Sequence, residues 1–355
     1  MCGPRPLAEV GRSRVRWYAC SIASQPAFGA SFSARRAAGH GLSGDSALSR
    51  VLTMSLDPLR LCAYWDQIAA QGYAWLDRQL AAAAGAGRRV ILTVGMKGLG
   101  WPEFYPPKGM ELARAGWRGV VAGQGALRQP LLDFVETTVR RYRDRSCIGW
   151  WQVENESFDR AGPGHRWVER GLLAAEIDLV RSLDERPIAL NAFGHLGPIA
   201  DSIASNLWVD VGALVGRGSR VAGELLALLR PGDVVGLDLY HRVGIMLPVL
   251  GRPHIVIAAR NWLRVAARLR DQARARGVET WVMEAQAEPW EPTAATAYDP
   301  ISLDPATMVA TIGEIVATGF DRVLLWGVEY WLGAEHNGND AWLKAGEGLL
   351  APATP

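Results

Sequence analysis

The sequence carries almost no excess charge and no long apolar run. Its 38 Lys and Arg residues nearly balance its 36 Asp and Glu residues, for a net charge of +2. Such a balance gives no electrostatic reason to expect binding to a nucleic acid or to an anionic membrane surface. The stretches Gly244–Leu250 and Ile255–Ala259 are separated by Arg252 and Pro253, and both fall short of the roughly 18 apolar residues of a membrane span. We therefore expect no nucleic acid and no membrane as a partner.

Residues for several kinds of chemistry are scarce or wrongly spaced. Lysine occurs only at Lys97, Lys108 and Lys344, none of them in a buried-strand pattern, which disfavours a Schiff-base mechanism. The four cysteines form no CxxC pair, and the six histidines form no HxH or HExxH motif. The GxSxG turn of serine esterases is absent. We expect neither a cofactor nor a metal ion.

The composition, 49% hydrophobic and 21% charged, is that of an ordinary globular protein. Residues 1–25 carry four arginines, but Trp17–Ser24 is too short and mixed for the apolar part of a signal peptide. We expect an N-terminal extension over 1–25, one domain over 26–345 and a C-terminal tail over 346–355. The lack of a clear signal peptide favours a cytoplasmic location.

Eight short apolar runs alternate with segments of helical period. The runs are Ala27–Phe32, Leu59–Tyr64, Val90–Val94, Ile148–Val153, Pro187–Asn191, Val234–Tyr240, Glu279–Glu284 and Arg322–Val328. The clearest helical segments are Tyr73–Ala86, Gln129–Arg143, Trp167–Leu183, Arg260–Arg276 and Pro305–Thr318. Eight strand and helix units without a linker predict an α/β fold, a single-domain (β/α)8 TIM barrel. The alternative, an open doubly wound sheet, lacks its usual Gly-rich first turn, since Gly39–Gly44 is not GxGxxG.

Polar residues are concentrated at the carboxyl ends of these runs, where barrels place their active sites. The fourth run is followed by Glu154, Asn155 and Glu156, and the seventh ends in Glu284. Strands four and seven lie on opposite sides of the barrel mouth, so their carboxylates should face each other. Two facing carboxylates are the apparatus of glycoside hydrolysis.

The chain resembles the barrel glycoside hydrolases of the large cellulase-type clan, clan A, and family 5 in particular. The likeness rests on WWQVENE, RPIALN, DVVGLDLY, WVMEAQAEPW and LLWGVEYW, which follow one another in the order typical of the clan, and on LRLCAYWDQI as its second strand.

This resemblance implies a role for each matching residue. Glu156 would be the general acid/base and Glu284 the nucleophile. The sugar site would consist of Asn155 on the 2-hydroxyl, Tyr240 and Arg60 on the nucleophile, and Trp326 under the sugar, with Gln286 and Trp290 as further contacts from the loop after the seventh strand.

Two departures from the clan leave the exact family and the sugar open. The third run ends in Thr93, Gly95, Met96 and Lys97, without the histidine that many members carry. After the sixth run, His241 follows Tyr240 instead of preceding it.

Several residues have a plainer interpretation beside the functional one. Glu154, Asp238 and Glu329 are more simply interior carboxylates paired with an arginine, although Glu154 or Glu329 is an alternative acid. Gln286 and Glu288 also fit a solvated loop. Among the fifteen tryptophans, those that follow strands are the candidates for sugar platforms: Trp65, Trp101, Trp290, Trp331 and Trp342.

The sequence therefore predicts a retaining glycosidase that acts on a β-linked glycan or oligosaccharide by double displacement. The alternative is a carbohydrate-binding barrel that has lost its activity. Such a barrel would be expected to lack one of the two acids, whereas both strand ends here carry glutamate. The partner is a carbohydrate in either case, and the oligomeric state is left open.

Overall fold

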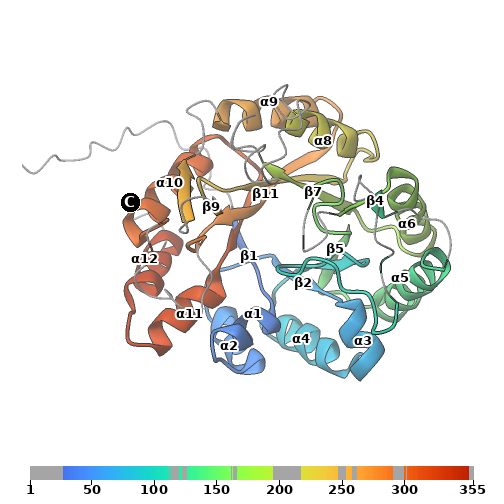
Figure 1. The fold of residues 1–355 in the computed structure, drawn as a ribbon, viewed down its shortest axis with the longest axis horizontal. Coiled ribbons are helices and arrows are strands. Elements are labelled where there is room, and N and C mark those ends of the chain that lie inside the picture. Colours follow the sequence, from blue (N-terminus) through green and yellow to red (C-terminus); the bar gives the residue numbers. More distant parts are fainter. Residues whose placement is uncertain are drawn as a thin grey trace, which may run out of the picture.

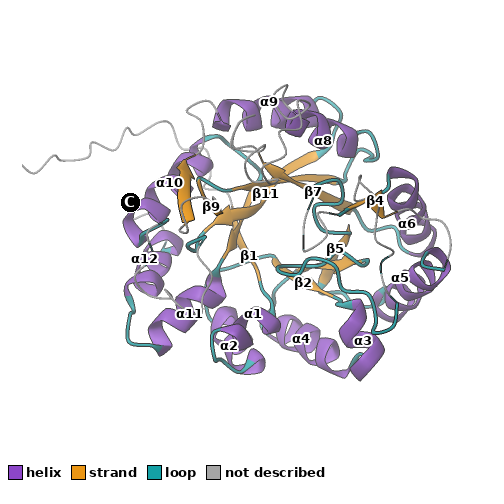
Figure 2. Cartoon of the chain, in the orientation of Figure 1, coloured by secondary structure: helices purple, strands orange, loops and turns teal. Residues whose placement is uncertain are grey.

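The computed structural model describes residues 27–110, 112, 120–121, 126–160, 162, 166–194, 217–246, 253–257, 262–290, 300 and 302–351. Parallel strands close into one barrel with helices around it (Figures 1 and 2). Because β1 pairs with both β2 and β12, the barrel has no open edge, which confirms the (β/α)8 fold and excludes the open sheet. The expected N-terminal extension, residues 1–25, lies outside the described residues.

The barrel strands follow one another in chain order. They are β1 (Ala27–Ser31), β2 (Leu59–Cys62), β3 (Val90–Val94), β5 (Ile148–Val153), β7 (Ile188–Gly194), β8 (Val234–Leu239), β11 (Glu279–Gln286) and β12 (Arg322–Trp326). Each of the eight predicted runs overlaps one of these strands. The prediction succeeds because strands buried on both faces are continuously apolar.

Helices cover the outside of the barrel. They are α1 (Ala34–Gly39), α2 (Gly44–Leu52), α3 (Trp65–Gln71), α4 (Ala74–Gly85), α5 (Arg128–Tyr142), α6 (Arg170–Leu183), α8 (Arg217–Leu226), α9 (Trp262–Arg274), α10 (Pro305–Ala317), α11 (Val328–His336) and α12 (Ala341–Leu350). The start of α10 shows how the sequence sets a boundary: the Asp304 carboxylate accepts the Thr307 N–H, and Pro305 occupies the first turn.

The segment around Trp167 differs from its prediction. The helical period predicts one helix over Trp167–Leu183, but Trp167–Val168 forms β6, which pairs with β4 (Val120–Val121), and α6 begins at Arg170. The Val168 N–H also donates to the Ser157 carbonyl at 2.7 Å. These extended contacts override the helical period. A second short pair, β9 (Arg242–Met246) and β10 (Pro253–Ile257), is antiparallel.

The barrel interior is apolar toward the amino ends of the strands, called the lower end here, and polar toward their carboxyl ends. Trp150 and Trp281 meet edge to face at the lower end, with ring centroids 4.8 Å apart. They belong to an interior layer made of Ile91, Trp150, Ala189, Val234, Trp281, Met283 and Leu324. Next comes a fully buried polar layer, in which Arg60 Nε donates to Gln152 Oε1 at 2.7 Å and Gln152 Nε2 donates to Asn191 Oδ1 at 2.7 Å. A closed lower end leaves the carboxyl ends of the strands as the place for a site.

The last helix extends past the expected domain boundary at residue 345. α12 continues to Leu350 and packs on α11. Its Gly346 lies so close to Trp331 that a Cβ built on it would be 2.3 Å from the ring. Residues 346–350 are therefore part of the packed helical layer. No helix in the described residues is long and apolar enough to span a bilayer.

Candidate active site

Glu284 faces the barrel interior because β11 is irregular where it lies. The pairing of β11 with β8 shifts between Val282 and Glu284, so Met283 is an extra residue. Trp281 and Met283 already face inward, and strict alternation would turn Glu284 outward. A bulge lets two consecutive residues face the same side. Glu284 therefore joins the mouth of the barrel, where only 4% of it is exposed.

Two donors hold the Glu284 carboxylate. Arg60 Nη1 donates to Oε1 at 2.6 Å, and Tyr240 Oη donates to Oε2 at 2.7 Å. Burial raises the pKa of Glu284, while Arg60 and Tyr240 act in the opposite direction by favouring the ionised form. Burial, followed by the Glu284 charge, raises the pKa of Tyr240 well above its usual value, so the phenol remains a donor. The carboxylate is fixed in orientation from two sides.

Glu156 follows β5 and adopts a left-handed backbone with φ 44°. Its N–H donates to Asn191 Oδ1 at 2.9 Å, and its carbonyl accepts Lys97 Nζ at 2.7 Å. Lys97 Nζ also donates to the Asp159 carbonyl at 3.1 Å. A left-handed glutamate is strained and needs support from its surroundings. These bonds supply that support and direct the side chain toward Glu284.

Asn155 lies beside the same network. Its Oδ1 accepts Arg60 Nη2 and also accepts Asn191 Nδ2, the latter at 2.9 Å. The oxygen is thus used by protein donors, which orients the Asn155 amide. The Nδ2 group is the part of this side chain that can donate to a ligand.

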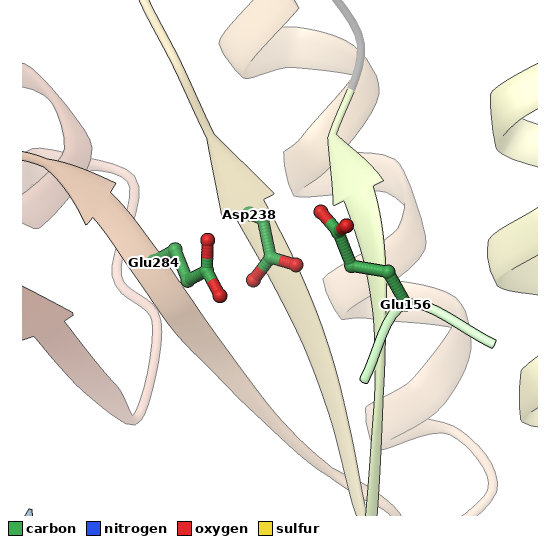
Figure 3. A group of neighbouring side chains, drawn as sticks. All are labelled: Glu156, Asp238 and Glu284. Atoms are coloured by element: carbon green, nitrogen blue, oxygen red, sulfur yellow. The ribbon is translucent and has the colours of Figure 1, made fainter. Parts of the chain in front are cut away.

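Asp238 of β8 stands between the two glutamates (Figure 3). One carboxyl oxygen from each of Glu156, Asp238 and Glu284 lies within 4.8 Å of the others. Asp238 is fully buried, and its Oδ2 accepts Asn191 Nδ2 at 2.6 Å. The sequence predicts an arginine partner for this residue, but no arginine bonds to it among the described residues. It is a third carboxyl of the site.

These three carboxyl groups could reach a common metal ion, but their other contacts do not suit one. Both Glu284 oxygens already accept protein donors, and one of those donors is the Arg60 guanidinium. A cation bound here would be repelled by that guanidinium. The arrangement is better suited to acid and base chemistry on a neutral ligand.

Sequence reasoning did not identify two further charged residues at the site. Lys97, which is fully buried, has its Nζ 3.7 Å from Glu156 Oε2. Glu103 has a left-handed backbone with φ 75°, and burial raises its pKa to about 8. The charge of Lys97 acts against this shift, whereas those of Glu156 and Glu284 add to it. The rarity of lysine was the one sequence signal for Lys97; for Glu103, which comes from a loop, there was none.

The aromatic candidates divide into core and rim. Trp65, Trp331 and Trp342 are buried in the helical layer, so their prediction as platforms was wrong. Trp101 is 73% exposed and Trp290 39% exposed, and Trp290 meets the Tyr240 ring edge to face at 5.5 Å. These two rings remain the described candidates at the rim.

Trp326 ends β12 and is 7% exposed. The Arg36 guanidinium lies 4.4 Å from the centre of its ring, and Arg36 is itself paired with Glu288. One face of the indole is therefore covered, and a sugar could meet only the rest of the ring.

Gln286, the last residue of β11, is bonded to the backbone at the start of β9. Its Oε1 accepts the Arg242 N–H at 2.9 Å and its Nε2 donates to the Arg242 carbonyl at 2.7 Å. With 2% exposure, Gln286 supports the segment after β8, and we leave it out of the sugar contacts proposed below.

The other two acids are structural in their contacts. Glu329 Oε2 lies 3.7 Å from Arg36 Nε, and its Oε1 accepts the Ser33 N–H at 2.6 Å, in line with a paired interior carboxylate. Glu154 does not have the expected arginine partner in the described residues. It accepts the N–H groups of Met96 and Lys97 and lies against the carboxyl of Glu176. Burial raises the pKa of Glu154 to about 7 and that of Glu176 well above its usual value.

Comparison with solved structures finds the same fold in carbohydrate-active proteins. GH5_18 from Bifidobacterium longum subsp. longum matches with a TM-score of 0.58 and 14% identity, over 94% of this chain and 82% of that one. A variant of it in complex with Manβ1-4GlcNAc matches with a TM-score of 0.54 at 14% identity, over 92% of this chain and 80% of that one. A GH10 endoxylanase retrieved from a sugarcane soil metagenome has a TM-score of 0.50 at 14% identity, over 85% and 86% of the two chains.

No protein-family model and no curated protein matches the sequence. The likeness is therefore carried by the fold at an identity far below the level that shows common activity. The structure shares its single-domain (β/α)8 barrel with these proteins.

Proposed function

We propose that the protein is a retaining glycosidase that cleaves a β-linked glycan or oligosaccharide by double displacement. The observation that carries this proposal is the meeting of Glu156 and Glu284 from opposite strand ends, with carboxyl oxygens within 4.8 Å of each other. Retaining enzymes keep their carboxyl groups about 5–5.5 Å apart, whereas inverting enzymes need about 6.5–9.5 Å for a water molecule. The short separation supports retention.

In the first step, Glu284 attacks the anomeric carbon while Glu156 gives a proton to the departing oxygen. Arg60 and Tyr240 hold the attacking carboxylate. In the second step, Glu156 takes a proton from water, the water oxygen bonds to the anomeric carbon, and the bond to Glu284 breaks. Asn155 Nδ2 donates to a sugar hydroxyl, while the open part of Trp326 and the ring of Trp290 contact its apolar side.

The test begins with a panel of 4-nitrophenyl β-glycosides, β-glucan and β-mannan. A β-mannoside belongs in the panel because the related GH5_18 variant binds Manβ1-4GlcNAc. Glu156→Ala should slow substrates with poor leaving groups far more than activated phenyl glycosides, by about 10²–10⁴-fold. Azide should restore its turnover and give a β-glycosyl azide.

Glu284→Ala should lose activity on both kinds of substrate, and any azide product should have the α configuration. Full activity of Glu156→Ala on a poor leaving group would overturn the assignment and make Glu154 or Glu329 the acid. If the wild type hydrolyses no glycoside of the panel, the alternative of a carbohydrate-binding protein is favoured instead.

A further inference from the structure

Asp238 is a buried carboxyl of the site that the mechanism above does not use. It lies between Glu156 and Glu284 on β8 (Figure 3). Its Oδ2 is occupied by Asn191, but its buried Oδ1 accepts no N–H or O–H in the described part of the chain. One oxygen of the Asp238 carboxyl lies within 4.8 Å of a Glu156 carboxyl oxygen. Two buried carboxyl groups this close repel each other when both are ionised, which favours a proton on one of them.

The surrounding charges point the same way. Arg60 and Lys97 bring two positive charges to the site, and Glu156, Asp238 and Glu284 bring three carboxyl groups. One proton among the three carboxyl groups makes this set neutral. Glu103, from the loop after β3, is an electrostatic neighbour of the set, and burial raises its pKa to about 8, which favours its protonated form. Tyr240 remains a neutral donor.

The surroundings of each carboxyl identify which of the three most readily keeps a proton. Glu284 accepts the Arg60 guanidinium and the Tyr240 hydroxyl, and both favour its ionised form. Burial, followed by the charges of Glu284 and Glu156, raises the pKa of Asp238 well above its usual value. The proton therefore belongs on the Asp238 side of the cluster.

We propose that Asp238 and Glu156 share one proton and that Asp238 is a positioning residue, which keeps this proton at Glu156 for transfer to the leaving oxygen. The proposal rests on the glycosidase function above. In the first step the pair gives its proton to the departing oxygen as Glu284 bonds to the anomeric carbon, so the pair becomes doubly ionised. In the second step the attacking water returns one proton to the pair.

The first test is kinetic and uses the full chain with its best 4-nitrophenyl β-glycoside. In Asp238→Asn the neighbouring negative charge is gone and an amide can donate to Glu156. The proton is then lost at lower pH, so the alkaline limb of kcat/KM should shift toward acid by about one unit. Asp271→Asn makes the same substitution on the exposed side of α9 and should leave the limb in place. An unshifted limb in a folded Asp238→Asn variant would overturn the proposal.

The second test needs no substrate and so separates this proposal from the proposed function. Infrared difference spectra at pH 7 report the C=O stretch of protonated carboxylic acids. Asp238→Asn should lose one protonated-acid band, and Glu156→Gln should shift the same band in frequency, because the proton lies on the buried Asp238 and is shared with Glu156. A band left unchanged by Glu156→Gln would overturn the sharing of the proton. This result also decides the matter if Asp238→Asn does not fold.

Discussion

At the scale of single residues, Glu284 depends on one cationic and one neutral donor. Arg60 supplies charge, and Tyr240 supplies a hydrogen bond without charge. Removing Arg60 would leave a buried carboxylate without its cation, whereas removing the Tyr240 hydroxyl takes away one hydrogen bond and leaves that cation in place. The tyrosine is therefore the better position for measuring what this hydrogen bond contributes.

Tyr240→Phe should lower kcat by about tenfold to a hundredfold, since a hydrogen bond to a charged group is worth about 1.5–3 kcal/mol. Kinetics on the best aryl glycoside would measure this change. Tyr73→Phe is the matched control, because its hydroxyl contacts Thr138. Equal kinetics in the Tyr240 and Tyr73 variants would contradict the role of Tyr240.

Site residues at the ends of the apolar runs were predictable from the sequence, whereas a site residue from a longer loop was not. Glu156, Glu284, Tyr240 and Asn155 follow or end apolar runs, so their convergence followed from the topology of a barrel. Glu103 comes from a loop whose left-handed backbone no periodic pattern encodes. The shared position of Asp238 also escaped prediction, because sequence spacing does not give carboxyl distances.

At the scale of elements, one buried amine holds the turn after β5. Lys97→Met should remove the donors to the Glu156 and Asp159 carbonyls and loosen this turn. We expect a loss of about 1–3 kcal/mol in the free energy of unfolding, and a lower kcat. Denaturant unfolding would measure the loss of stability, and hydrogen exchange over residues 154–159 would measure the loosening of the turn. Steady-state kinetics would measure kcat. Lys344→Met, at an exposed position of α12, should change neither.

The packing of α12 provides a second prediction, with both variants on one helix. Gly346→Ala should destabilise the protein by about 1–3 kcal/mol, because the new methyl group meets the Trp331 ring. A Cβ built on Gly348 has nothing within 4 Å, so Gly348→Ala should stabilise the helix by up to about 1 kcal/mol. Thermal unfolding of both variants checks the opposite signs. A neutral Gly346→Ala would mean that α12 does not pack as described.

The bulge in β11 marks the limit of pattern reasoning for elements. Apolar runs gave all eight strands, yet alternation alone would have turned Glu284 away from the interior behind Met283. The resemblance to the cellulase-type clan puts Glu284 at the end of the seventh run, whereas the bulge depends on pairing with β8. The local periodicity of hydrophobic residues does not reveal pairing between strands that are far apart in the sequence.

At the scale of the whole molecule, buried acids should make stability depend on pH. The pKa values of Glu154 and Glu103 are raised to about 7 and about 8, from 4.5 in an unfolded chain. The folded state then holds more protons than the unfolded state between these limits, so stability is full below about pH 4.5 and falls as pH rises toward 8. Thermal unfolding between pH 5 and about 8.5 should show a declining midpoint.

The variant Glu176→Gln should make that decline shallower, because it removes an acid whose own pKa is raised by burial, while the new amide can still donate to Glu154. Glu136→Gln, on the exposed side of α5, is the control and should leave the slope unchanged. A midpoint that rises from pH 5 to about 8.5 would contradict the burial of these acids.

The apolar layer at the lower end of the barrel has a consequence for the order of events. The interior is filled by Trp150, Trp281 and their neighbours, so the barrel is open only at the carboxyl ends of its strands and does not form a channel. In the proposed mechanism, the severed half of the glycan and the incoming water would use the same opening. The first product would have to move aside before hydrolysis could finish, and an alcohol at that opening would compete with water for the sugar on Glu284. The proposed mechanism therefore predicts transfer of the sugar to an added alcohol alongside its release by water.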